Sequence, residues 1–228
     1  MKKIITVLAA AFCCACGAAD YATLVKEAQA AANEKKYTLA EQKYAEAFNA
    51  AKEGKEKYTA VRTYAAYLVS QKQKDKAAEI IENELKKENY SAGERQRLLV
   101  DIAAMFLWDG KKYQYALDKL NLAFSLKGVA EDSILYFVMC HYSACIYSTF
   151  KKEYEPVITI CEPAAAKSKV GWHKATLYSA TATAYMKLGA RDEAVKNFEL
   201  ALHYGRTDKR FSKKDIARIE KKLADLKK

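Results

Sequence analysis

The chain has 228 residues, a formal net charge of +11 and a hydrophobic content of 51%. It contains only two prolines and eight glycines, so it lacks the composition of a linker-rich or low-complexity chain, and helix is expected nearly throughout.

The first 19 residues predict an export signal that does not belong to the fold. Lys2 and Lys3 give a basic start, an apolar stretch runs from Ile4 to Cys16, and the small residues 17–19 follow. This order is typical of a secretory signal peptide, and the apolar part is too short to span a bilayer as a stable helix. An alternative is a lipoprotein acylated at Cys16, although the preceding cysteines fit a lipobox poorly.

The remaining 20–228 segment predicts one exported domain, periplasmic or secreted, or tethered if Cys16 is acylated. No other apolar stretch is long enough to cross a membrane, so no transmembrane segment is expected in the mature chain. The length suits one elongated domain.

Paired helices are predicted in chain order. The first pair is Tyr21 to Asn33 and Tyr37 to Lys52, joined by a charged turn. The third pair opens with Ser91-x-x-Glu94, a capping-box pattern. Later inner turns are expected at 109–111, 150–153 and 188–192. A final helix begins at Ser212 and carries one apolar stripe, formed by Ile216, Ile219, Leu223 and Leu226.

An internal repeat underlies this series of helices. Three alanine triplets share the spacing A-x11-A-x6-A; they are Ala28/Ala40/Ala47, Ala104/Ala116/Ala123 and Ala182/Ala194/Ala201. The frame from Ala65 continues to Ala77 but fails at Glu84, and the frame from Cys145 gives Val157 and Ala164. Five units therefore begin near Tyr21, Tyr58, Arg97, Val138 and Ala175. Stacked helical hairpins are expected, because one hairpin alone cannot bury its apolar face.

Small residues at close helix contacts, with a large residue between them, resemble the tetratricopeptide repeat. The fifth unit is most similar, through Tyr178, Ala182, Tyr185, Gly189, Ala194, Phe198 and Ala201. The spacings of 37 to 41 residues exceed the family's usual 34, and no unit has the terminal proline. The resemblance implies an all-α solenoid of about five helix-turn-helix repeats over 20–208, closed by a capping helix over 209–228. An undifferentiated helical-repeat solenoid is the alternative.

Members of this family bind peptides or helices along the face formed by the first helix of each repeat. Carrying the repeat frame over predicts that the middle of this groove is lined by Asp101, Met105, Trp108, Tyr142, Ile146 and Phe150. The other units would contribute Gln29, Arg62, Ser179, Thr183 and Met186. The alternative is core packing, because aromatic and methionine stripes at helical spacing are usually buried and a one-residue error in register would exchange the two faces. The clamp of paired Lys and Asn by which some members grip a terminal carboxylate is absent.

Catalytic and metal sites are not predicted. The three histidines lack a second ligand at metal-site spacing, and no cofactor motif is present. Cys145 lies four residues from His141 and would share its helix face, but both fall on core positions, which favours packing over a cysteine-dependent enzyme. Beyond residue 19 the cysteines are Cys140, Cys145 and Cys161, an odd number. A disulfide between the last two and buried free thiols both remain open.

The positive charge concentrates in turns and at helix ends, for example Lys35-Lys36, Lys111-Lys112 and Lys151-Lys152. Solvated turns explain such lysines, and export argues against nucleic acid as a partner, so the remaining electrostatic partner is an anionic envelope surface. The prediction is a non-enzymatic, cofactor-free scaffold that holds a protein or peptide partner. The alternative is an envelope-anchored lipoprotein subunit of an outer-membrane assembly or secretion complex.

Overall fold

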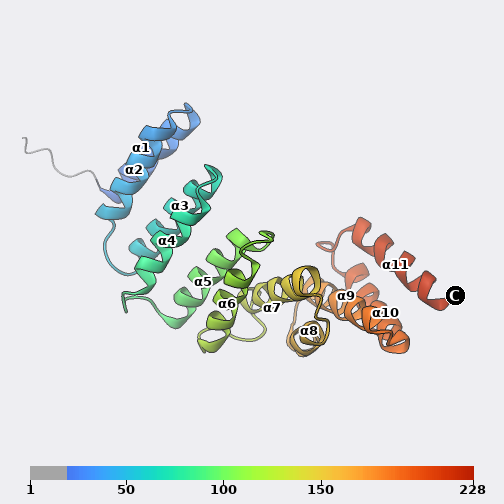
Figure 1. The fold of residues 1–228 in the computed structure, drawn as a ribbon. Coiled ribbons are helices and arrows are strands. Elements are labelled where there is room, and N and C mark those ends of the chain that lie inside the picture. Colours follow the sequence, from blue (N-terminus) through green and yellow to red (C-terminus); the bar gives the residue numbers. More distant parts are fainter. Residues whose placement is uncertain (1–19) are drawn as a thin grey trace, which may run out of the picture. The chain divides into compact units, whose positions relative to one another are not determined.

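The computed structural model describes residues 20–228, so the predicted signal peptide and the acylation of Cys16 lie outside the described residues. Within this range the chain forms eleven α-helices and one short π-helix, and no strand (Figure 1). The helices are α1 (Tyr21–Asn33), α2 (Tyr37–Ala50), α3 (Lys55–Ser70), α4 (Lys74–Leu85), α5 (Ala92–Phe106), α6 (Tyr113–Ser125), α7 (Ile134–Ile146), η1 (Tyr147–Lys151), α8 (Glu155–Lys167), α9 (Gly171–Leu188), α10 (Arg191–Thr207) and α11 (Lys213–Lys227).

Short turns join consecutive helices into five hairpins, α1/α2 to α9/α10, and α11 packs on α10. The predicted all-α architecture of helix-turn-helix repeats is confirmed. The first helix has the bounds that the sequence predicted, and the second ends two residues earlier.

The described residues divide into two compact units rather than the one elongated domain expected from the length, with the division between Ala60 and Val61 inside α3. The first unit contains the α1/α2 hairpin, whose core includes Leu24, Ala28 and Tyr44. The second unit contains the rest of α3, α4, the three following hairpins and α11. A repeat array divides readily because each hairpin packs only on its neighbours.

Helix starts follow the side chains that can cap them. Asp20, Ser91, Ser133 and Ser212 each accept a hydrogen bond from the backbone N–H three residues later. The capping box predicted at Ser91 is present, because Glu94 also accepts from the Ser91 backbone at 2.9 Å.

The alanine frame holds in three hairpins and shifts by one residue in two. The triplet alanines of the first and fifth hairpins are all buried, and so are Ala65 and Ala77 in the second. In the third hairpin Ala104 is exposed and Ala103 is fully buried. In the fourth, Ala144 is buried and Cys145 is only partly buried.

In the two shifted hairpins, one additional residue separates the buried small residue of the first helix from the corresponding position in the second helix. Each case has a structural cause. The α5–α6 turn runs over 107–112, longer than the turn 34–36 of the first hairpin. In the fourth hairpin α7 continues into the π-helix η1, whose wider turn takes up one additional residue. Hairpin geometry is therefore preserved while the sequence register moves.

The C-terminal part of the second unit has two apolar clusters. Cys140 and Cys161 are fully buried with Phe137 and Leu177 in the first, and the three described cysteines are free thiols. In the second, Ile219 of α11 packs with Phe198 and Ala201 of α10. Helix α11 therefore covers the last hairpin with the apolar stripe that the sequence predicted.

Candidate functional site

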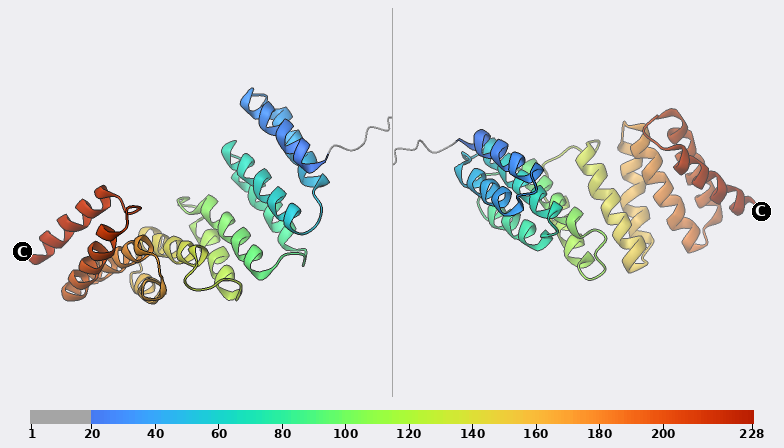
Figure 2. Two further views of the ribbon diagram at one scale, coloured as in Figure 1. Left: turned by 180° about the vertical axis from the view of Figure 1, so that it is seen from behind. Right: turned by 90° about the horizontal axis from the view of Figure 1, so that it is seen from above.

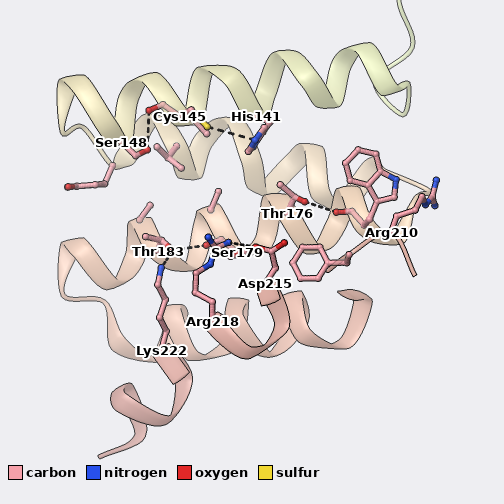
Figure 3. A pocket seen from close by; sticks show the side chains of 17 residues that line it. His141, Cys145, Ser148, Thr176, Ser179, Thr183, Arg210, Asp215, Arg218 and Lys222 are labelled. Atoms are coloured by element: carbon pink, nitrogen blue, oxygen red, sulfur yellow. Dashed lines mark hydrogen bonds and ion pairs between the residues drawn. The ribbon is translucent and has the colours of Figure 1, made fainter. Parts of the chain in front are cut away.

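One pocket lies between α7, α9 and α11, within the second unit. Its volume is about 550 Å³, and we call it the C-terminal pocket (Figure 3). Helix α7 contributes His141 and Cys145, and η1 contributes Ser148; α9 contributes Thr176, Ser179 and Thr183; α11 contributes Asp215, Arg218 and Lys222; the α10–α11 loop contributes Arg210 and Phe211. This volume lies within the usual range for ligand sites.

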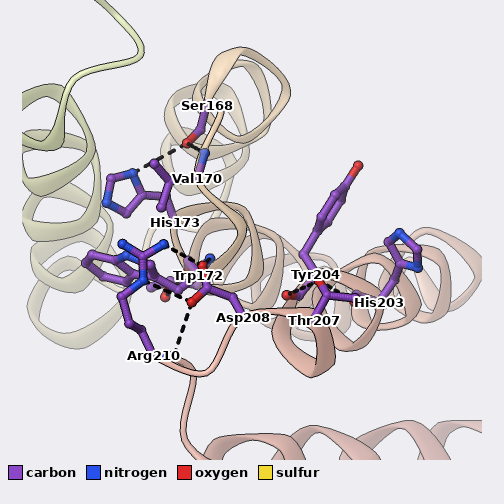
Figure 4. Close-up of polar contacts among 10 residues, drawn as sticks. Ser168, Val170, Trp172, His173, His203, Tyr204, Thr207, Asp208 and Arg210 are labelled. Atoms are coloured by element: carbon purple, nitrogen blue, oxygen red, sulfur yellow. Dashed lines mark hydrogen bonds and ion pairs between the residues drawn. The ribbon is translucent and has the colours of Figure 1, made fainter.

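The α10–α11 loop is fixed by a carboxylate. Asp208 accepts from the Trp172 backbone N–H at 3.0 Å and from the Arg210 guanidinium at 2.7 and 2.9 Å (Figure 4). The guanidinium holds the pKa of Asp208 well below its usual range. Gly171 permits this approach, because a Cβ there would lie 3.1 Å from that of Asp208. The loop thereby places Arg210 and Phe211 at one end of the pocket.

The wall formed by α9 presents hydroxyl oxygens as acceptors. Thr176 donates to the Trp172 carbonyl at 2.8 Å, and Thr183 donates to the Ser179 carbonyl at 2.8 Å. Because each hydroxyl proton is used within the helix, the oxygen lone pairs remain for partners that donate. Lys222 uses one of them, donating to Thr183 Oγ1 at 3.1 Å.

Lys222 is a charged residue of the pocket that has no carboxylate partner in residues 20–228. Burial, followed by the nearby Arg218 and Lys187, lowers its pKa. Arg218 is paired with Asp215 at 2.8 Å, whereas no carboxylate in residues 20–228 lies within ion-pair distance of Lys222. Its other neighbour is the Phe198 ring, whose centroid lies 5.7 Å from Nζ. This half-buried ammonium therefore has only uncharged partners, which favours the arrival of an anion.

Two more polar atoms of the pocket residues lack a partner. Trp172 Nε1 and His141 Nδ1 are buried and make no hydrogen bond in the described chain. Native proteins leave few such groups unsatisfied. The Lys222 ammonium can only donate, so the pocket suits a ligand that carries acceptors, such as carboxylates and backbone carbonyls.

The His141–Cys145 pair in this pocket is not poised for nucleophilic chemistry. Cys145 Sγ lies 3.9 Å from His141 Nε2. Burial raises the pKa of Cys145 to about 11 and lowers the pKa of His141. Both groups are therefore neutral at pH 7, and the thiolate that a cysteine nucleophile requires is not formed.

Three of the residues predicted for the groove meet in a smaller pocket of about 320 Å³ between α3 and α5. Arg62 Nε donates to Asp101 Oδ2 at 2.6 Å, and Met105 lines the same wall with the exposed Ala66 and Ala104. Ser179 and Thr183, also predicted for the groove, line the C-terminal pocket. Five of the residues predicted for one groove therefore line two separate pockets.

Other predicted groove residues lie elsewhere. Ile146 is fully buried, so the prediction that it lines the groove is wrong; the one-residue shift of the fourth hairpin turns it into the core. Trp108 is 66% exposed, in the turn after α5, which also rules out core packing for it. Phe150 lies in η1 and stacks on Tyr113 with ring centroids 5.1 Å apart. Tyr142 is half-buried, and Met186 packs against the cluster around Phe198.

The C-terminal pocket includes residues that the sequence missed. His141 and Cys145 stand three before and one after the buried Ala144, the same offsets at which Ser179 and Thr183 stand from Ala182. Ser148 stands four after Ala144. Choosing Ala144 as the small residue of the fourth unit would have found them. Lys222 and Arg218 have no counterpart in the repeat frame, because they belong to α11.

Solved structures similar to this chain are helical-repeat proteins. Two crystal structures of MamA match with TM-scores of 0.60 and 0.59 at 18% and 19% identity, covering 84% and 79% of this chain and 95% of each MamA chain. A P58(IPK) TPR domain aligns over 92% of this chain and 57% of its own, at 16% identity and a TM-score of 0.44. No family model matches the sequence, and no curated protein does. The fold is that of a tetratricopeptide-like helical repeat.

Across residues 20–228, every helix falls short of the length and apolar character that a membrane crossing requires.

Proposed function

We propose that this chain is an exported protein-binding scaffold whose C-terminal pocket holds an extended segment of a partner protein. The observation that carries the proposal is Lys222, a half-buried cation that lines an open pocket and has only uncharged partners, the Thr183 hydroxyl and the Phe198 ring. A second observation supports it: in this tetratricopeptide-like fold, two walls of the pocket are the first helices of neighbouring repeats, α7 and α9. Repeat arrays use such surfaces for binding rather than for chemistry.

The pocket sets the length of the segment. It follows α9 from Trp172 to Thr183, which at 1.5 Å per residue is roughly 16 Å. An extended chain rises about 3.3 Å per residue, so about five residues fill it. Lys222 and Thr183 mark one end, and Arg210 marks the other (Figure 3). We therefore expect an extended pentapeptide with an acidic residue at the Lys222 end.

The test uses fluorescent pentapeptides with a glutamate at one terminus, compared with the same peptides carrying glutamine. Fluorescence anisotropy should show that Lys222→Ala weakens binding of the glutamate peptides at least tenfold, because removing one partner of a desolvated charge pair costs several kcal/mol. Lys221→Ala is the matched control, since that lysine is exposed on the same helix. Equal affinity of Lys222→Ala and Lys221→Ala for the glutamate peptides would refute the proposal.

Export is part of the proposal and has its own test. The basic, apolar and small-residue order of residues 1–19 supports it. Fusing this segment to a reporter enzyme that is active only after export should give activity, and replacing the apolar stretch with polar residues should abolish it. A reporter that stays inactive with the native segment would refute export.

The envelope-anchored alternative depends on Cys16. Acylation would keep the chain in the membrane fraction and add the mass of the lipid to the processed protein. Cys16→Ser should then release the chain, and a processed protein without that mass would exclude the lipoprotein. An anionic envelope surface remains part of the proposed set of partners.

A further inference from the structure

The inner turns of three successive hairpins lie next to one another in the second unit. Lys112 of the α5–α6 turn forms an ion pair with Asp75 at the start of α4. Phe150, in η1 before the α7–α8 turn, stacks on Tyr113. The right-hand view of Figure 2 places the turns after α5, α7 and α9 along the same edge of this unit. We call the surface formed by residues 71–76, 107–113 and 147–153 the turn edge.

The turn edge carries cations without counterions. Lys72, Lys74, Lys111 and Lys152 are exposed, and none has a carboxylate partner in the described part of the chain. Lys112 and Lys151 are paired with Asp75 and Glu153. The edge therefore has an excess of positive charge that no group of this unit neutralises.

Two of these lysines occupy a backbone conformation that favours glycine. Lys72 has a φ of 63° and Lys152 a φ of 56°, whereas Gly189 fills the left-handed position in the turn of the last hairpin. A non-glycine residue in this region is strained, so the fold alone favours glycine at both positions. The sequence has lysine there, which indicates that the charge itself has a use.

An exposed aromatic ring lies on the same edge. Trp108 has 66% of its surface exposed in the turn after α5, three and four residues before Lys111 and Lys112. An isolated solvated turn explains lysines but not an exposed tryptophan. Tryptophan prefers the boundary between lipid headgroups and acyl chains, where the ring meets apolar groups and the indole N–H stays hydrated.

We propose that the turn edge docks on an anionic phospholipid surface, with Trp108 in the headgroup region and the four unpaired lysines against the lipid charges. Cations flanking an aromatic anchor favour a lipid surface over a nucleic acid, whose phosphates are read through many ion pairs. The proposal goes beyond the binding of a protein segment in the C-terminal pocket. Of the residues that line that pocket, only Ser148 belongs to the turn edge, and the docking does not use it.

The test measures co-sedimentation with vesicles. Wild type should bind vesicles of phosphatidylcholine mixed with phosphatidylglycerol, should not bind pure phosphatidylcholine, and should dissociate at high salt. Each lysine near an anionic surface contributes about a fivefold increase in partitioning, so Lys72→Gly/Lys152→Gly should weaken binding about 25-fold. This variant stays folded because glycine suits both backbone positions. The charge-matched control is Lys214→Ala/Lys221→Ala, two exposed lysines of α11.

Fluorescence locates the contact. The chain has two tryptophans, so Trp172→Phe leaves Trp108 as the only one, and its emission should shift to the blue with anionic vesicles. In Trp108→Phe the remaining Trp172 emission should not move. No sedimentation with anionic vesicles, or equal binding by the glycine variant and the control, would overturn the proposal, as would binding to polyglutamate but not to vesicles. Lys222→Ala should leave vesicle binding unchanged, which separates this proposal from the proposed function.

Discussion

Glu84 stands where the repeat frame expects a small residue, and it makes a sharp test of how this fold is stabilised. It is 3% exposed on α4, accepts from Tyr90 Oη at 2.9 Å and accepts from Lys87 Nζ at 2.6 Å. A buried carboxylate is tolerated only with such donors. Glu84→Ala would restore the alanine of the repeat pattern and remove both hydrogen bonds.

The two effects have unequal size. A buried hydrogen bond to a charged group contributes about 1.5–3 kcal/mol, and the ion pair with the half-exposed Lys87 adds ~0–1 kcal/mol. The higher helix propensity of alanine returns only a few tenths of a kcal/mol. Glu84→Ala should therefore destabilise the chain by about 2–3 kcal/mol, which lowers Tm by roughly 5–10 °C for a protein of this size.

Thermal and urea unfolding followed by far-ultraviolet circular dichroism measure the change. Glu84→Gln, which keeps an acceptor for Tyr90, should lose about half as much. A double-mutant cycle with Tyr90→Phe isolates the Glu84–Tyr90 bond and should give a coupling above about 1 kcal/mol. If Glu84→Ala proved as stable as wild type, the preference of the repeat for a small residue would outweigh the hydrogen bonds, and the reasoning would fail.

Three further predictions follow from burial and backbone geometry. The raised pKa of Cys145 lowers its thiolate fraction at pH 8 about a hundredfold, so an aromatic disulfide reagent should label it at least that much more slowly in the folded chain than in urea; equal rates would contradict the burial. Burial lowers the pKa of His141 and His173, so the unfolded chain takes up protons first and stability should fall as pH drops below about 6.5. In the double variant His141→Gln/His173→Gln, Tm should fall less steeply with decreasing pH than in wild type. An unchanged pH dependence of Tm would refute the histidines as its cause. Lys72→Gly and Lys152→Gly should each stabilise by about 0.5–1 kcal/mol in urea unfolding, since glycine relieves the left-handed backbone strain, whereas alanine should give no such gain.

The sequence predicted the helices well because their signals are local. Alanine spacing, capping side chains and glycine turns each act within one hairpin, and the capping box at Ser91 and the apolar stripe through Ile219 both formed as expected. Ser179 and Thr183 line the C-terminal pocket at the offsets that the repeat frame gives, since the fifth hairpin keeps that frame without insertion.

The site in the fourth hairpin could not be predicted in the same way. Ala144 and Cys145 are adjacent small residues, and either satisfies a small-residue frame. Only the π-helix η1 selects Ala144, and a wide helical turn leaves no composition signal in the sequence. Lys222 was missed for a different reason. On an amphipathic capping helix, a lysine off the apolar stripe looks solvated, and its half-burial depends on where α9 lies.

The positions that carry the functional proposals are those at which the repeat pattern does not determine the residue. A regular small or large position is fixed by packing with the neighbouring hairpin, so its identity says little about function. Lys222 on the cap and the left-handed lysines of the turn edge are not fixed by packing. Each has a cost, either partial burial of a charge or backbone strain. Because the two costs fall on separate surfaces, Lys222→Ala and Lys72→Gly/Lys152→Gly should each impair one kind of binding and spare the other. A variant that lost both would point instead to one shared surface for protein and lipid.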